Sequence, residues 1–140
     1  ARSLCLQILF ANNFSGSDFD SLFSNFYLSQ DNDLEKKSYN KKQIEYASRL
    51  YSFVIKEKDQ VDKLIESKLV NWEMNRLATI DRIILRMAIT EMLYLDDIPP
   101  KVSITEAVEI AKDFSSEDSS GFINGVMDAI YNDEYNKKKK

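Results

Sequence analysis

The chain has 140 residues, of which 44% are hydrophobic and 11% aromatic, enough to build the core of one domain. Its formal net charge is −4, and its one basic block is Lys137 to Lys140. Proteins that bind nucleic acid without a specialised site carry a basic surface, so this balance excludes them. The absence of histidine and the single cysteine exclude the usual zinc sites and an internal disulfide framework.

Apolar residues recur at helical spacing, and only three glycines and two prolines interrupt them, so the sequence predicts an all-α fold. We expect a first helix from the start of the chain to about Asn12, with Leu4, Cys5, Ile8 and Leu9 inward. Further helices are expected around Phe19–Tyr27 and Ile44–Ile55, separated by a polar loop from Ser29 to Lys42. A fourth helix is expected to begin at a cap provided by Asp59 and to carry Val61, Leu64, Ile65 and Leu69.

The segment from Arg76 to about Leu95 is predicted to be a central helix, because its polar residues form one narrow stripe. That stripe contains Thr79, Arg82, Arg86 and Thr90. Asp81 and Glu91 interrupt the apolar remainder. Since Asp81 lies in the first turns, the helix dipole offers one explanation for its presence.

Two more helices are expected after Pro99 and Pro100. Ser103 and Glu106 have the spacing of a capping box, and the helix that follows is expected to bury Ile104, Ala107, Val108, Ala111 and Phe114. Ser115 or Ser116 can cap the last helix, with Glu117 and Asp118 at its positive end.

The last helix places Gly121, Asn124, Gly125 and Asp128 on one face, although each glycine costs a helix about 1 kcal/mol relative to alanine. Removing side chains lets another backbone approach closely. We expect tight packing against a neighbouring helix, with a bound partner as the alternative.

The sequence contains no phosphate-binding glycine loop and no G-x-S-x-G motif, and no spacing pairs a nucleophile with a base. Glu106 and Glu109 are expected to form part of a solvated helix face. No apolar run approaches the roughly 20 residues that span a membrane, and no secretory signal pattern is present. These features predict a helical binding module of the cytoplasm, without a cofactor, a metal or an enzymatic activity.

Three motifs in the second half of the chain carry a family resemblance. The pattern R-x-[IL]-L-R-x-A-x-x-E-[LM] matches Arg82 to Met92, D-[IV]-P-x-x-V-x-I-x-E-A-[VI]-E-[LI]-A-K matches Asp97 to Lys112, and F-x-x-E-D-S-x-x-F-[VI]-N-G-V-[LM]-D matches Phe114 to Asp128. Ala1 to Phe10 adds a weaker match. In these motifs the chain resembles the NusB transcription antitermination family.

The resemblance implies a compact bundle of about seven helices and a role in ribosomal RNA transcription complexes. Proteins of this kind are not enzymes; they bind a boxA element of nascent RNA together with the ribosomal protein NusE, within the RNA polymerase antitermination complex. Self-association as a homodimer is a further state that the resemblance allows. It also implies an arginine-rich segment leading into the first helix, of which this sequence contains Arg2. We expect an added arginine-rich extension to steepen the salt dependence of RNA binding.

The resemblance also assigns candidate site residues. Arg2, Gln7 and Phe10 match RNA-facing positions of the first helix, and Asp118 and Phe122 match the junction of RNA and partner. The partner-binding positions are Asp81 and Phe122. For each of these residues an ordinary structural role is the alternative: a solvated charge for Arg2, a core position for Phe10 and Phe122, and a dipole partner for Asp118.

We expect residues 1–136 to form a single NusB-like RNA-binding domain and residues 137–140 to form a disordered basic tail. Two other functions stay open at this point. One is a helical scaffold that binds only proteins, which the acidic balance allows. The other is the NusB-like domain of a ribosomal RNA cytosine methyltransferase, which would require a longer parent chain.

Overall fold

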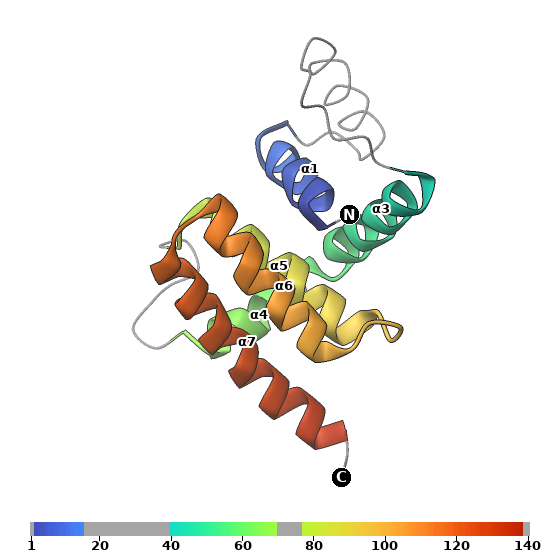
Figure 1. Cartoon of the computed structure of the whole chain (residues 1–140). Helices are drawn as coiled ribbons and strands as arrows, with labels where there is room; N and C mark the ends of the chain where they lie inside the picture. The colour runs from blue at the N-terminus through green and yellow to red at the C-terminus, as the bar shows by residue number, and fades with distance from the viewer. Residues whose placement is uncertain (1, 16–39, 70–76, 139–140) are drawn as a thin grey trace. The chain divides into compact units, whose positions relative to one another are not determined.

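A computed structural model describes residues 2–15, 40–69 and 77–138 of the chain (Figure 1). These residues contain six helices and no strand, which confirms the predicted all-α class. The helix expected around Phe19–Tyr27 and most of the loop expected from Ser29 lie outside the described residues, as does Arg76. Within the described ranges, no helix is both long and apolar enough to cross a membrane.

The chain divides into two compact units, which are described separately. The first, Ala1–Ser52, contains α1 (Arg2–Ser15) and most of α3 (Lys41–Lys56). The second, Phe53–Lys140, contains α4 (Lys58–Ser67), α5 (Thr79–Tyr94), α6 (Pro100–Phe114) and α7 (Glu117–Lys138). Because α7 extends to Lys138, the first two lysines of the expected tail belong to a helix.

Helix α1 is buried over most of its circumference. Leu4, Cys5, Ile8 and Leu9 are buried as predicted, and Leu6 joins them with 1% of its surface exposed. Ser3, Gln7 and Phe10 are less buried, and their spacing of i, i+4 and i+7 places them on one face. This face is the accessible side of the helix.

Helix α3 begins with a capping box. The backbone N–H of Gln43 donates to Asn40 Oδ1 at 2.8 Å, and the N–H of Asn40 donates to Gln43 Oε1 at 2.9 Å. The helix expected around Ile44–Ile55 is confirmed. Its buried face contains Ala47, Leu50, Tyr51 and Val54, whereas Ile55 points outward and is 47% exposed.

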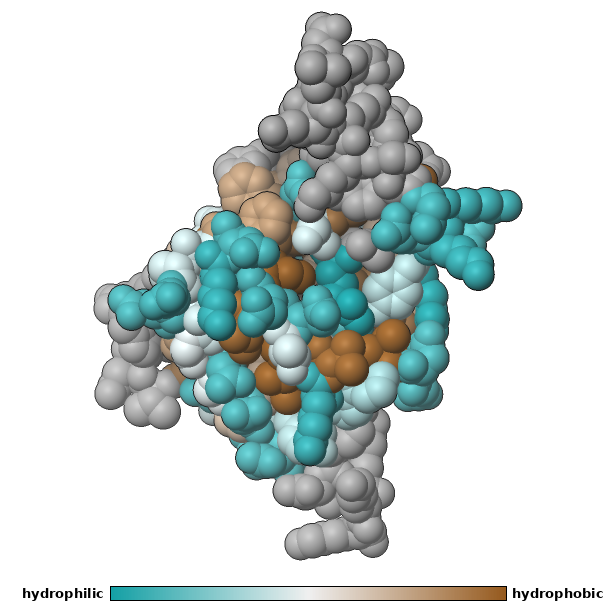
Figure 2. Space-filling model, viewed as in Figure 1, coloured by the Kyte–Doolittle hydropathy of each residue, from teal (hydrophilic) through white to brown (hydrophobic). Residues whose placement is uncertain are grey.

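In the second unit α6 packs against both α5 and α7, and α4 contacts α5 and α7. The fully buried side chains of α5 include Ile84, Leu85 and Ile89, and those of α7 include Ile123. Burial of each such side chain stabilises the folded state by roughly 1.5–3 kcal/mol, because its apolar surface is removed from water. The face of the described residues seen in Figure 2 is hydrophilic over much of its area, with hydrophobic residues exposed near its centre.

Two predicted caps are wrong. Glu57, not Asp59, is the N-cap residue of α4; its side chain makes no capping hydrogen bond, and Asp59 lies within the first turn. Helix α6 begins directly at Pro100, because proline suits the first helical position, and Pro99 is its N-cap residue. Ser103 therefore lies inside the helix, where it is buried and donates to Glu91 Oε1 at 2.7 Å.

Helix α6 buries Ile104, Ala107 and Ala111 as predicted, together with Ile110. Val108 is only half-buried. The expectation that Phe114 is buried is wrong: it is the last residue of the helix, beyond the packed turn, and is 42% exposed.

The described residues do not bear out the expected reason for the two glycines of α7. A Cβ atom added at Gly121 or Gly125 would meet nothing within 4 Å. Asn124 and Asp128 on the same face are exposed as well. Close packing against another helix of the described chain therefore does not explain these glycines.

Candidate functional site

Helix α1 carries three of the residues that the sequence singled out. The guanidinium carbon of Arg2 lies 5.7 Å from the centroid of the Tyr46 ring of α3, a cation–π geometry that orients the arginine. Gln7 is half-buried, and Phe10 is 37% exposed. Phe10 is thus not a core residue, and it presents aromatic surface beside the Gln7 amide.

The first turn of α7 holds Asp118 in an exposed position, with Phe122 one turn further along and half-buried. Ser116 caps this helix, as the sequence predicted, because its Oγ accepts from the backbone N–H of Ser119 at 3.1 Å. Ser120 is buried and donates its hydroxyl to the carbonyl of Glu117 at 2.7 Å. The hydrogen bonds of Ser116 with Ser119 and of Ser120 with Glu117 therefore fix the turn of backbone that carries Asp118.

Asp81 joins the start of α5 to the start of α7. Its Oδ2 accepts from Ser119 Oγ at 2.9 Å, and Ser119 Oγ also lies 2.9 Å from Ser115 Oγ and 3.1 Å from Ser116 Oγ. Asp81 is 8% exposed, and its Oδ1 is buried without a hydrogen-bond partner in the part of the chain that the structure describes. Asp81 therefore has a role in the fold, and its contact with a partner stays a prediction.

The structure thus brings Asp81, Asp118 and Phe122 to one end of the second unit. Arg2, Gln7 and Phe10 belong to the first unit. The serines that connect Asp81 to α7 were not identified as site residues from the sequence, although the run SSEDSS marks them as a helix start. Only the fold shows that the third of these serines, Ser119, reaches a residue 38 positions earlier.

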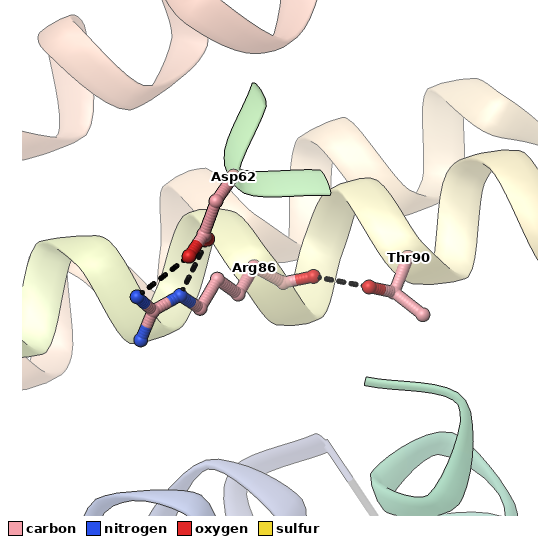
Figure 3. Close-up of polar contacts among 3 residues, drawn as sticks. All are labelled: Asp62, Arg86 and Thr90. Carbon is pink, nitrogen blue, oxygen red and sulfur yellow. Dashed lines mark hydrogen bonds and ion pairs between the residues drawn. The ribbon is translucent and has the colours of Figure 1, made fainter. Parts of the chain in front are cut away.

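The polar stripe of α5 makes a further set of contacts. Arg86 donates from Nε to Asp62 Oδ1 at 2.7 Å and from Nη2 to Asp62 Oδ2 at 3.0 Å (Figure 3). Thr90 donates its hydroxyl to the carbonyl of Arg86 at 2.6 Å. This bidentate pair ties α5 to α4 and leaves Arg86 little capacity to bind a ligand.

Within the described residues no group of three or more histidine, cysteine, aspartate or glutamate side chains could hold a metal ion. The described residues present two candidate binding surfaces. One is the accessible face of α1 with its aromatic ring and amide, and the other is the acidic start of α7, which a serine caps. A helical scaffold with such surfaces has the features of a binding module.

Comparison with known proteins identifies the family. The NusB family model matches residues 1–132. The chain is 32% identical over 127 residues to the transcription antitermination protein NusB of Clostridium novyi (strain NT), with 91% of this chain and 92% of that protein aligned. The chain belongs to the NusB family, which confirms the resemblance seen in the motifs.

A second relative aligns over a shorter region. The transcription antitermination protein NusB of Chloroherpeton thalassium (strain ATCC 35110 / GB-78) is 48% identical over 93 residues, or 66% of this chain. The aligned region spans 44% of that relative's own length.

The fold has a solved counterpart in a structure described as the antitermination factors NusB and NusE in complex with dsRNA. The superposition has a TM-score of 0.78 at 25% sequence identity and covers 93% of this chain and 92% of that chain. The likeness therefore extends through both units of the chain and is not confined to the motifs of the second half.

Proposed function

We propose that this chain is a transcription antitermination factor that binds boxA RNA together with NusE in ribosomal RNA transcription complexes. The observation that carries the proposal is the likeness, over 93% of the chain, to a solved assembly of NusB, NusE and dsRNA. The chain acts by binding, not by catalysis, in the cytoplasm, as part of the RNA polymerase antitermination complex.

The accessible face of α1 is suited to RNA. An exposed phenylalanine ring can stack on an unpaired base, and a neighbouring amide can donate to and accept from a base edge. Phe10 and Gln7 provide these two groups. Arg2 supplies a positive charge for phosphate, and its contact with Tyr46 limits the side-chain entropy lost on binding.

The start of α7 is suited to a junction between RNA and a protein partner. Phe122 keeps part of its ring accessible, and Asp118 is exposed one turn earlier. A carboxylate near RNA opposes phosphate, whereas the same carboxylate attracts a basic protein. We assign Phe122 to both surfaces, and Asp81 to the partner surface, where it acts by holding this turn in place through Ser119.

Titration of labelled boxA RNA with the chain, alone and with NusE, tests the proposal, with a scrambled RNA of equal length as the control. The proposal requires sequence-dependent RNA binding that NusE strengthens. Binding of NusE without any binding of RNA would favour the purely protein-binding scaffold, which the net charge of −4 allows. Binding of neither component would contradict both functions.

A further inference from the structure

Arg82 is a cation without an anionic partner among the residues that the structure describes. It lies in the first turns of α5, and its side chain is half-buried. Its Nε is buried and has no hydrogen-bond acceptor within the described ranges. Its Nη2 lies 3.5 Å from Thr79 Oγ1, at the outer limit of a hydrogen bond.

Arg86, one turn further along α5, is an arginine of the same polar stripe whose guanidinium is fully paired with a carboxylate. Both of its contacts with Asp62 are short, and the carboxylate uses the Nε and Nη2 edge of the guanidinium (Figure 3). In Arg82 the corresponding edge has a buried Nε and one long contact to a neutral hydroxyl. Since an unpaired buried donor lowers stability, no contact among the described residues explains why Arg82 occupies this position.

The acceptor that fits this edge is an anion with two oxygen atoms, because a guanidinium binds carboxylates and phosphates through two parallel hydrogen bonds. Asp81, the preceding residue, does not supply it, since its Oδ2 accepts from Ser119 of α7. Among the described residues no carboxylate pairs with Arg82, so its guanidinium has the capacity to bind an anion of another molecule.

We propose that Arg82 binds a phosphate of the RNA. This inference rests on the proposed function and extends the RNA surface to a residue outside the set that the sequence pointed to. The Asp81–Ser119 contact joins the residue before Arg82 to the start of α7, which carries Asp118 and Phe122. A phosphate bound by Arg82 would therefore lie at the same end of the second unit as those two residues.

The test measures boxA RNA affinity, with saturating NusE, across a range of salt concentrations for the wild type, Arg82→Gln and Arg82→Lys. Loss of one phosphate contact lowers the slope of log affinity against log salt by about 0.7 for single-stranded RNA. We expect Arg82→Gln to show that decrease and to bind roughly threefold to tenfold more weakly at low salt. Arg82→Lys keeps the charge but loses the paired hydrogen bonds, so it should keep the slope and bind with intermediate affinity.

Lys101→Gln is the matched control, because it removes one positive charge from an exposed position at the start of α6. It should leave both the slope and the affinity unchanged. An Arg82→Gln variant that behaves like Lys101→Gln while the wild type binds RNA would overturn the inference and leave the proposed function intact. If the wild type binds no RNA even with NusE, both are overturned.

NusE binding without RNA and thermal unfolding distinguish a phosphate contact of Arg82 from its other possible roles. If Arg82→Gln weakens NusE binding in the absence of RNA, the acceptor is a carboxylate of the protein partner and the inference is wrong. A large fall in the thermal unfolding midpoint would show a structural role and would also overturn it. The inference requires the midpoint to change by no more than a few degrees.

Discussion

The contact between Ser103 and Glu91 shows how one hydroxyl can hold two helices together. Both residues have 1% of their surface exposed, and Ser103 Oγ donates to Glu91 Oε1 across the interface of α5 and α6. A buried carboxyl oxygen is costly without a donor. The motif residue Glu91 is therefore explained by the fold and needs no role in binding.

Ser103→Ala should lower the free energy of unfolding by about 1–3 kcal/mol, because it leaves Glu91 Oε1 without this donor. Thr105→Ala is the control, since Thr105 is exposed on the same helix. Denaturant unfolding of both variants gives the comparison. Equal stabilities would mean that the hydrogen bond contributes nothing to the fold.

Tyr94, at the end of α5, predicts an alkaline dependence of stability. Its pKa is raised above 10.0, first by burial, then by the charge of Glu57 and a hydrogen bond to Glu57, and also by the charge of Glu134. The folded chain therefore favours the neutral phenol more than the unfolded chain does. This contribution is complete below about pH 10 and is lost as the pH rises through the raised pKa.

Tyr94→Phe removes the titrating group and should flatten the loss of stability above pH 10 relative to the wild type. Thermal unfolding of both proteins between about pH 9 and 11 measures the difference. The same slope in both proteins would show that Tyr94 does not contribute to the alkaline transition.

At the scale of elements, α7 combines a strongly fixed start with a face that nothing in the described chain covers. Gly121 and Gly125 lie on that face in open space. Replacing Gly125 with alanine should stabilise the chain by about 0.5–1 kcal/mol, because alanine loses less backbone entropy and has room for its methyl group. A decrease in the thermal midpoint would contradict this account and would indicate a close neighbour.

The start of α7 allows two substitutions with opposite expected effects on RNA binding. Phe122→Asp should weaken it by about 1–3 kcal/mol, because it removes a stacking surface and adds a charge that repels phosphate. Asp118→Asn should strengthen it, because it removes an exposed negative charge. RNA titration with NusE present measures both.

Thermal unfolding is the control for this pair. Asp118 is exposed, so its substitution should leave the midpoint nearly unchanged. Phe122 is half-buried, so a small decrease is expected for Phe122→Asp. A loss of several kcal/mol without a selective effect on RNA would assign Phe122 to the core instead.

At the scale of the whole molecule, helical periodicity predicted the class of fold and most of the buried positions, because each buried face repeats locally along the chain. It failed where the outcome depends on neighbours that the periodicity does not identify. Ile55 and Phe114 have helical spacing with buried residues and yet are exposed: Ile55 points away from the buried face of α3, and Phe114 is the last residue of α6. The motif order indicated the family, and the family model confirms it over residues 1–132.

The candidate site was less accessible to sequence reasoning. Exposure of Phe10 and the serine cap of α7 follow from local patterns. The hydrogen bond from Ser119 to Asp81 joins residues 38 positions apart. Whether Arg82 Nε has an acceptor among the described residues depends on which residues surround it in the fold. A local sequence pattern predicts neither feature.

The central claim is that this chain joins RNA and NusE in one complex, and the most direct test is thermodynamic linkage between the two ligands. The affinity for boxA RNA is measured with and without NusE, and the affinity for NusE with and without RNA. The account predicts cooperative assembly, in which NusE strengthens RNA binding and RNA strengthens NusE binding by the same factor. RNA affinity that is undetectable in both conditions, or equal for boxA and scrambled RNA, would contradict the account.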